Sequence, residues 1–204
     1  MSETPENVKP SRRRRSDARR SIDAILGGAR NLFGERPDAT MEDVAQAAGV
    51  SRQTVYAHFP SRDALIASLI EAAGSETVDA IDAAHLDAVP PLDALWRYLA
   101  ISWQLVQRYP FLLGTALGRT PPGHAATHLA GVERLEEIIR RGRQTGVFDR
   151  ELPADWLAAA VIGLCATAAA RFAVGRATAD EAYSALSVSV LRLCTANGAA
   201  GPGG

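Results

Sequence analysis

Residues 40–62 contain two short stretches of helical periodicity joined by a glycine, and this pattern constrains the fold more than any other part of the chain. Thr40 stands where an N-cap is expected, and Asp43 follows three residues later, which predicts a capping box. A helix over residues 41–48 should follow. Gly49 then suits a tight turn between helices, because glycine readily adopts the left-handed backbone conformation.

The second helix of this unit, residues 51–59, is predicted to expose a flank rich in hydrogen-bonding side chains. Ser51 stands at its N-cap. Val55 and Phe59 should be buried together, because residues four positions apart share one helix face. The flank left outside carries Arg52, Gln53, Thr54, Tyr56 and His58. Two short helices of this kind predict a helix-turn-helix, whose second helix enters the major groove of DNA.

The first turn of the second helix carries the side chains best suited to contact base edges. Arg52 can pair with guanine and Gln53 with adenine, and a good bidentate contact discriminates between bases by about 1–3 kcal/mol. Thr54 is expected to contact a thymine methyl group or a phosphate. Thr40 and Ser51 fit both a simple capping role and a phosphate contact, because a helix N-terminus itself favours phosphate.

Helical periodicity continues to the end of the chain without any credible strand alternation or internal repeat, so we predict an all-α fold of about nine helices. We expect a flexible basic arm at residues 1–16 and a helix-turn-helix DNA-binding domain at residues 17–60. A helical effector-binding and dimerisation domain should occupy residues 61–196, followed by a flexible tail at residues 197–204. The arginine-rich arm is interpreted either as a solvated tail or as a segment that follows phosphates or enters a minor groove.

Composition limits the partners of the chain. The formal net charge is -1, so affinity for nucleic acid must come from a local basic patch. Cys165 and Cys194 lack metal-site or redox-motif spacing, which predicts reduced core thiols in a cytoplasmic protein. Neither a signal peptide nor an apolar window long enough for a membrane span is expected, so no membrane partner is predicted.

No sequence signature of an enzyme is recognised. HExxH, GxSxG, phosphate-loop and dinucleotide-binding patterns are all absent from the sequence. His124 and His128 are four residues apart and could share a helix face, but no third ligand follows at a recognisable spacing. We therefore expect no catalytic residue, no metal site and no cofactor.

Residues 20–73 resemble the N-terminal domain of the TetR-type (tetracycline-repressor-like) transcriptional regulators. The resemblance consists of an apolar helix ending in Leu-Phe, a Thr-capped helix, an Ala-Gly-Val-Ser turn and a recognition helix ending in Tyr-x-His-Phe, followed by a basic residue and a leucine. The matching residues here are Leu32, Phe33, Thr40, Ala48, Gly49, Val50, Ser51, Tyr56, His58, Phe59, Arg62 and Leu65. By this resemblance Thr40, Ser51, Tyr56, His58 and Arg62 should hold backbone phosphates.

Two departures from the family pattern lie near the helix-turn-helix. The connection between Phe33 and Thr40 lacks the usual glycine-aromatic pair and carries Arg36 and Pro37 instead. The family's usual lysine after the recognition helix is Arg62, which keeps the charge and adds a planar fork of donors.

The resemblance implies a transcriptional regulator, with repression as the family's habit, that leaves its operator when a small-molecule effector binds the C-terminal domain. It also implies a homodimer formed through the last two helices, whereas an alanine-rich intramolecular core is the alternative reading of those helices. Trp96, Trp103 and Phe111 are candidates for the effector pocket, although aromatic residues at helical spacing also fit a plain core. The alternative function is a helical small-molecule-binding or scaffolding protein with a vestigial DNA-binding head.

Overall fold

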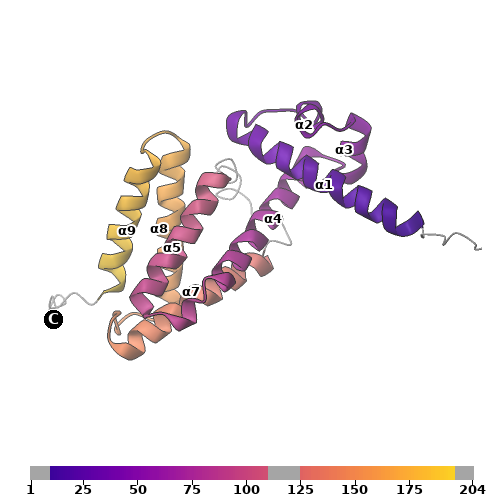
Figure 1. The fold of residues 1–204 in the computed structure, drawn as a ribbon. Coiled ribbons are helices and arrows are strands. Elements are labelled where there is room, and N and C mark those ends of the chain that lie inside the picture. Colours follow the sequence, from indigo (N-terminus) through magenta and orange to yellow (C-terminus); the bar gives the residue numbers. More distant parts are fainter. Residues whose placement is uncertain (1–9, 110–124, 196–204) are drawn as a thin grey trace, which may run out of the picture. The chain divides into compact units, whose positions relative to one another are not determined.

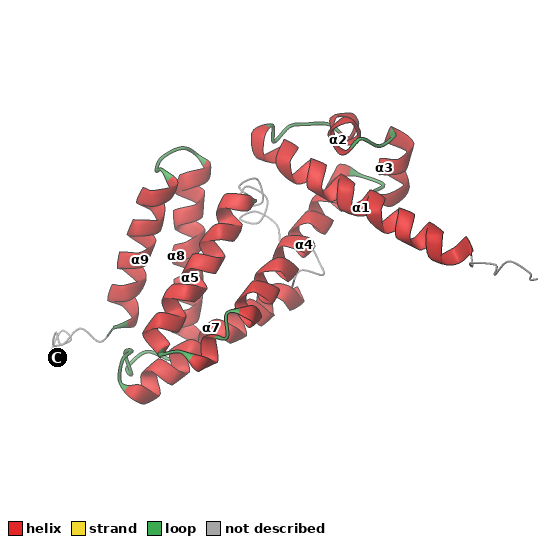
Figure 2. Ribbon diagram, in the orientation of Figure 1, coloured by secondary structure: helices red, strands yellow, loops and turns green. Residues whose placement is uncertain are grey.

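The computed structural model describes residues 10–109 and 125–195, and it contains only helices and their connections in these ranges (Figure 1, Figure 2). The all-α prediction is therefore confirmed for the described residues. The sequence also predicts a short apolar helix from Phe111 to about Arg119, and this segment lies outside the described residues. The described α-helices are α1 (Pro10–Glu35), α2 (Met41–Ala48), α3 (Arg52–His58), α4 (Arg62–Ala83), α5 (Pro91–Arg108), α7 (Ala125–Thr145), α8 (Ala154–Ala173) and α9 (Ala179–Cys194), with a 3-10 turn, η1, at Leu86–Ala88.

The first helix is longer than the sequence pattern suggests. We expected residues 1–16 to form a flexible arm, whereas α1 begins at Pro10. Proline is favoured in the first turn of a helix, and arginine is a good helix former, so the arginine-rich run can be helical without an apolar stripe. Residues 1–9 of the predicted arm lie outside the described part of the chain.

The chain divides into two compact units, Met1–Leu69 and Ile70–Gly204, with the boundary inside α4. In the N-terminal unit α1 packs against α2 and α3, and α2 packs against α3. Buried apolar side chains from all four helices form its core. These include Ile25, Ala29, Phe33, Val44, Val55, Phe59 and Leu65.

In the C-terminal unit α5 packs against α7 and α9, and α8 packs against α7 and α9 (Figure 1). Fully buried leucine, isoleucine and valine side chains of these helices form its core. Thr178 and Glu181 are three residues apart, a spacing that predicts a capping box at the start of the last helix. This box is present, because Thr178 accepts from the Glu181 N–H and Glu181 accepts from the Thr178 N–H. The end of α5 is tied to α4 by Glu76, which accepts from the Tyr109 hydroxyl at 3.0 Å.

By length and composition, α8 could cross a membrane, so the expectation that no apolar window is long enough is wrong. The reason is that its charged residues, Asp155 and Arg171, lie near its two ends and leave an apolar interior. A core helix of a water-soluble protein meets the same criterion. Leu157, Ala158 and Val161 of α8 are buried in the C-terminal unit. The length and composition of α8 therefore do not by themselves assign it to a membrane.

Candidate nucleic-acid interface

The N-terminus of α2 is fixed by the predicted capping box. The Thr40 hydroxyl accepts from the Asp43 N–H at 3.2 Å, and Asp43 Oδ2 accepts from the Thr40 N–H at 2.8 Å. The Thr40 hydroxyl also donates to the same carboxylate oxygen at 2.7 Å. These hydrogen bonds from the Thr40 side chain and main chain lower the pKa of Asp43 below its ordinary value. The cap therefore sets where α2 begins and how its first N–H groups point.

The turn between α2 and α3 uses the glycine as the sequence predicts. Gly49 has φ 66° and ψ 28°, in the left-handed region, and its N–H donates to carbonyls in the last turn of α2. Ser51 then caps α3, because its hydroxyl accepts from the Thr54 N–H at 3.1 Å. The two hydroxyl groups of Ser51 and Thr54 are themselves 2.8 Å apart. Both ends of the turn are thus held by local hydrogen bonds.

The two faces of α3 separate as the four-residue spacing predicts. Val55 has no exposed surface and Phe59 has 6%. The opposite flank carries Arg52, Gln53 and Tyr56, which are exposed, together with the half-buried Thr54 and His58. A continuous row of donors and acceptors on a short helix can reach base edges when that helix lies in a major groove.

Two contacts hold the Arg52 side chain along this flank. Its Nη1 atom lies 3.3 Å from Glu42 Oε2 on α2, and its guanidinium lies 5.4 Å from the centroid of the Tyr56 ring. Both partners of the ion pair are exposed, and such surface pairs are worth only about 0–1 kcal/mol. Arg52 is therefore oriented in the free protein by contacts that a base or phosphate can replace. No local sequence pattern indicates the role of Glu42, because it is ten residues away from Arg52 on the other helix.

Arg62 is already engaged by the N-terminal unit itself. Its Nε donates to the carbonyl of Ala39 at 3.3 Å, and its Nη2 donates to the carbonyl of Pro37. Its guanidinium also lies 4.9 Å from the centroid of the Phe33 ring. These contacts connect the first residue of α4 to the connection between α1 and α2. The phosphate contact expected of Arg62 stays a prediction, and its contacts to the protein were not foreseen.

A close approach of α1 to α2 explains one of two adjacent glycines. A Cβ atom at Gly28 would lie 3.0 Å from Ala48 N and 3.1 Å from Ala47 C, whereas one at Gly27 would meet nothing within 4 Å. Only the absence of a side chain at Gly28 lets the backbones approach this closely. From the sequence, the glycine pair indicates only a weakened helix, because each glycine costs up to about 1 kcal/mol relative to alanine.

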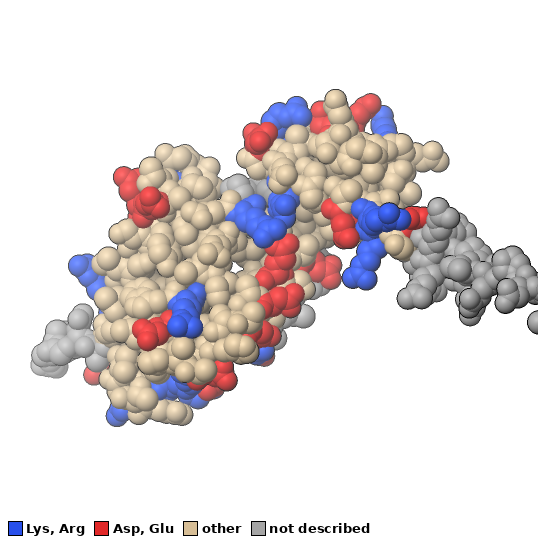
Figure 3. Space-filling view, viewed as in Figure 1, with Lys and Arg blue, Asp and Glu red and all other residues tan. Residues whose placement is uncertain are grey.

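The charges of the N-terminal unit are mixed. Acidic and basic side chains are both visible on the face seen in Figure 3. Besides the Arg52–Glu42 pair, Arg36 lies 3.6 Å from Asp43 at the start of α2. Affinity for a polyanion must therefore come from local groups such as the α3 flank, in agreement with the net charge of -1.

The candidate pocket residues in the C-terminal unit have different environments. Trp103 is buried, and its ring centroid lies 6.0 Å from that of Phe172 and 5.8 Å from that of Tyr183. Trp96 is half-buried and packs against the core, and Phe111 lies outside the described residues. Within the described ranges no group of three or more His, Cys, Asp or Glu side chains could hold a metal ion.

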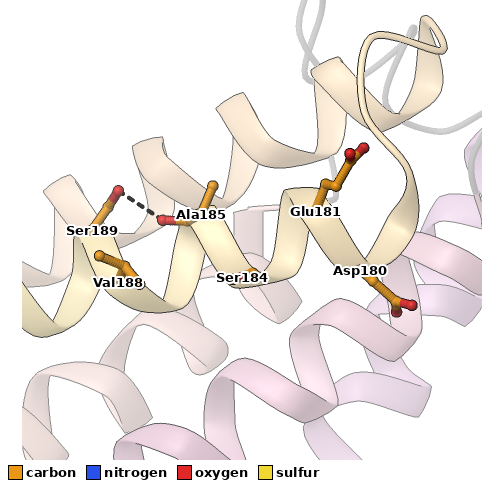
Figure 4. A pocket seen from close by; sticks show the side chains of 6 residues that line it. All are labelled: Asp180, Glu181, Ser184, Ala185, Val188 and Ser189. Atoms are coloured by element: carbon orange, nitrogen blue, oxygen red, sulfur yellow. Dashed lines mark hydrogen bonds between the residues drawn. The ribbon is translucent and has the colours of Figure 1, made fainter.

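The last two helices expose an apolar surface. Trp156 of α8 is 63% exposed, and Val188 and Leu191 of α9 are 46% and 37% exposed. A groove of about 350 Å³ lies between the two helices. Figure 4 shows small side chains next to Val188 along α9, with the Ser189 hydroxyl donating to the Ala185 carbonyl. Small exposed side chains of this kind permit another helix to approach closely.

Comparisons with known proteins agree with this geometry. A sequence model of the family described as "Bacterial regulatory proteins, tetR family" matches residues 25–69. The chain is 30% identical over 128 residues to the HTH-type transcriptional regulator NfxB of Pseudomonas aeruginosa, a match that covers 59% of this chain and 65% of that protein. The match thus spans just under two thirds of the length of that relative.

Solved structures match over more of the chain. The TetR family transcriptional regulator PfmR of Thermus thermophilus is similar with a TM-score of 0.66 and 28% identity, over 82% of this chain and 97% of that one. The TetR-like regulator LfrR of Mycobacterium smegmatis, solved in complex with proflavine, has a TM-score of 0.64 and 24% identity, over 84% and 94%. Both units of the fold therefore have counterparts in these proteins.

Proposed function

Because this chain belongs to the TetR family of bacterial regulatory proteins, we propose that it is a cytoplasmic, sequence-specific DNA-binding repressor of transcription. The observation that carries the proposal is the separation of the two faces of α3. Val55 and Phe59 are buried, while Arg52, Gln53 and Tyr56 are exposed on the opposite flank. A recognition helix needs this arrangement, because the flank that contacts bases must be free of the protein's own core.

Arg52 and Gln53 are the proposed base-reading residues, and Thr54 is proposed to contact a thymine methyl group or a phosphate. Tyr56 and His58 further along α3 are proposed to hold phosphates. Contacts of this second kind fix register without reading sequence. The weak ion pair of Arg52 with Glu42 supports its role, because little free energy is needed to redirect this side chain toward a base.

We propose that two copies associate through α8 and α9, so that two recognition helices bind two half-sites. The exposed apolar side chains of Trp156, Val188 and Leu191 support this proposal, because a monomer gains nothing by leaving them in water. The small residues beside Val188 allow helices of two copies to pack closely. A symmetric pair would use the same surface on both copies.

A dimerisation test follows from the position of Val188. Val188→Arg is expected to shift the chain from dimer to monomer in sedimentation equilibrium, because it places two charges at the centre of the proposed interface. Val147→Arg is the matched control, since Val147 is 39% exposed and lies on neither α8 nor α9. A Val188→Arg protein that remains dimeric would rule out this surface.

The effector is proposed to bind in the C-terminal unit near Trp96, Trp103 and Phe111, and to release the operator. The rings of Trp103, Phe172 and Tyr183 pack together in this unit, so a flat aromatic compound is the first class of ligand to test. Proflavine, the compound in the LfrR structure, has this chemistry and is the probe to use. It should quench the tryptophan fluorescence of the protein in the absence of DNA, since a flat cationic compound also binds duplexes. Tryptophan emission that saturating proflavine leaves unchanged would exclude proflavine as a ligand.

The decisive experiment measures binding to duplex DNA that flanks the chain's own gene, in a gel-shift assay with unlabelled competitor. Arg52→Ala and Gln53→Ala should each weaken specific binding, whereas Arg97→Ala on α5 and Gln46→Ala on α2 should not. The controls match residue type and exposure, because all four side chains are exposed. Absence of specific binding by the unmodified protein would favour a helical binding protein with a vestigial DNA-binding head.

A further inference from the structure

We propose that Arg62 is a positioning residue, which holds the connection between α1 and α2 in place, and that it does not contact phosphate. This inference rests on the proposed DNA-binding function. The connection leads directly into the first turn of α2, the helix that precedes the recognition helix α3. We refer to residues 36–40 as the α1–α2 connection. A family lysine at this place would act as a point charge, whereas the contacts of Arg62 use the shape of its guanidinium.

Three contacts fix the guanidinium of Arg62. Arg62 Nε donates to the carbonyl of Ala39 at 3.3 Å, and Nη2 donates to the carbonyl of Pro37. The guanidinium lies over the Phe33 ring, with Cζ 4.9 Å from the ring centroid. Two donors in one plane therefore bind two carbonyls of the connection while an aromatic ring supports them. An ammonium group cannot reproduce this pattern, because it has no planar fork of donors.

The residues held by Arg62 lie immediately before the cap at which α2 begins. Ala39 is buried, and its N–H donates to the carbonyl of Arg36 at 3.0 Å. The next residue, Thr40, caps α2, and Glu42 in the first turn of α2 forms the ion pair with Arg52. Arg62 thus acts on the recognition helix through the connection and the first turn of α2.

The same geometry links the two departures from the family pattern. The connection has lost the usual glycine-aromatic pair and contains Pro37, whose ring nitrogen carries no N–H and which can offer only its carbonyl. Arg62 supplies the donor for that carbonyl and for the carbonyl of Ala39. We therefore interpret Arg62 and the altered connection as one coupled change. A phosphate contact by Arg62 would require the guanidinium to leave these carbonyls and the ring.

The test compares Arg62→Lys, Arg62→Gln and, as a control that keeps charge within the same connection, Arg36→Lys. Arg36 is exposed, and its ion pair with Asp43 is 3.6 Å long, so this control should change little. Affinity for the operator duplex is measured by fluorescence anisotropy at several salt concentrations. Circular dichroism verifies that each variant is folded at the assay temperature, and Arg62→Lys alone carries the comparison if Arg62→Gln unfolds.

A positioning role predicts that Arg62→Lys and Arg62→Gln both bind roughly tenfold more weakly, the effect expected of lost main-chain hydrogen bonds. The salt dependence should be unchanged, because no phosphate contact is lost. A phosphate contact predicts the opposite pattern. Arg62→Lys would then bind like the unmodified protein. Arg62→Gln would show a weaker salt dependence, because the negative slope of log affinity against log salt would become shallower by about 0.9.

A second measurement needs no DNA. Amide hydrogen exchange of Ala39 should be faster in both Arg62 variants than in the unmodified protein and unchanged in Arg36→Lys. Unchanged exchange in Arg62→Lys would overturn the proposal. If the unmodified protein bound no duplex at all, the proposed function would fail, while the exchange data would still decide whether Arg62 holds the connection.

Discussion

α1 and α2 cross so closely that two adjacent glycines of α1, Gly27 and Gly28, should respond differently to replacement by alanine. A Cβ atom at Gly28 would lie 3.0 Å from Ala48 N and 3.1 Å from both Ala47 C and Ala48 Cα. All three are backbone atoms, so no side-chain rotation can relieve the contact. At Gly27 the added atom would meet nothing within 4 Å. Gly27→Ala and Gly28→Ala therefore differ only in whether the added methyl group meets the backbone of α2.

The expected magnitudes follow from two opposing effects. Replacing a glycine inside a helix by alanine stabilises that helix by up to about 1 kcal/mol, and this gain applies at both positions. Overpacking typically costs about 1–3 kcal/mol, and this cost applies only at Gly28. Gly27→Ala should therefore raise the free energy of unfolding by up to about 1 kcal/mol. The free energy of unfolding of Gly28→Ala should be about 1–3 kcal/mol lower than that of Gly27→Ala.

Urea unfolding of the full chain, followed by circular dichroism, measures both variants against the unmodified protein. The slope of free energy against urea should stay the same, so that the midpoints report stability directly. Equal stability of Gly28→Ala and Gly27→Ala would contradict the close crossing, because it would mean that the α2 backbone at Ala47 and Ala48 leaves room for a methyl group at Gly28.

Three further predictions concern packing and ionisation. Gly142→Ala should destabilise the protein by about 1–3 kcal/mol in thermal unfolding, because the new Cβ would overlap the buried ring of Phe148; an unchanged midpoint would contradict this contact. Asp43 has a lowered pKa in the folded protein, so its carboxylate stabilises the fold above its unfolded pKa of about 3.9 and loses this effect as pH falls through the folded value. Asp43→Asn should accordingly be less stable than the unmodified protein at pH values above that window and equally stable below it, in urea unfolding at a series of pH values, and a difference independent of pH would count against the cap. Burial raises the pKa of Cys165 to about 12 and that of Cys194 to about 11, so both thiols should be protonated at neutral pH. The buried Cys194 should react with an aromatic disulfide reagent only after unfolding, and fast labelling of Cys194 in the native protein would argue against its burial.

The parts of the fold that the sequence predicts correctly are set by neighbouring residues. The capping boxes at Thr40 and Thr178 form because their partners are three residues away. The burial of Val55 and Phe59 follows from the helical period alone. Such features depend on local geometry, which a single sequence contains.

The features that the sequence does not predict depend on the path of the chain between helices. Arg62 reaches carbonyls more than twenty residues away, and no periodicity brings these groups together. The pairing of Glu42 with Arg52 depends on the angle between α2 and α3. The start of α1 at Pro10 was also missed, because its first two turns are helical without an apolar stripe to reveal them. Tertiary contacts and helix propensity decide these cases.

Selection from a pool of random duplexes would show whether the exposed flank of α3 reads duplex DNA. We expect enrichment of a twofold-symmetric sequence whose half-sites lie about 34–36 Å or a multiple apart, as for a dimeric helix-turn-helix protein. Selection with Arg52→Ala should relax one base position in each half-site and leave the spacing unchanged. Failure to enrich any sequence, or recovery of the same motif with the same stringency by Arg52→Ala and Gln53→Ala, would contradict this role of α3.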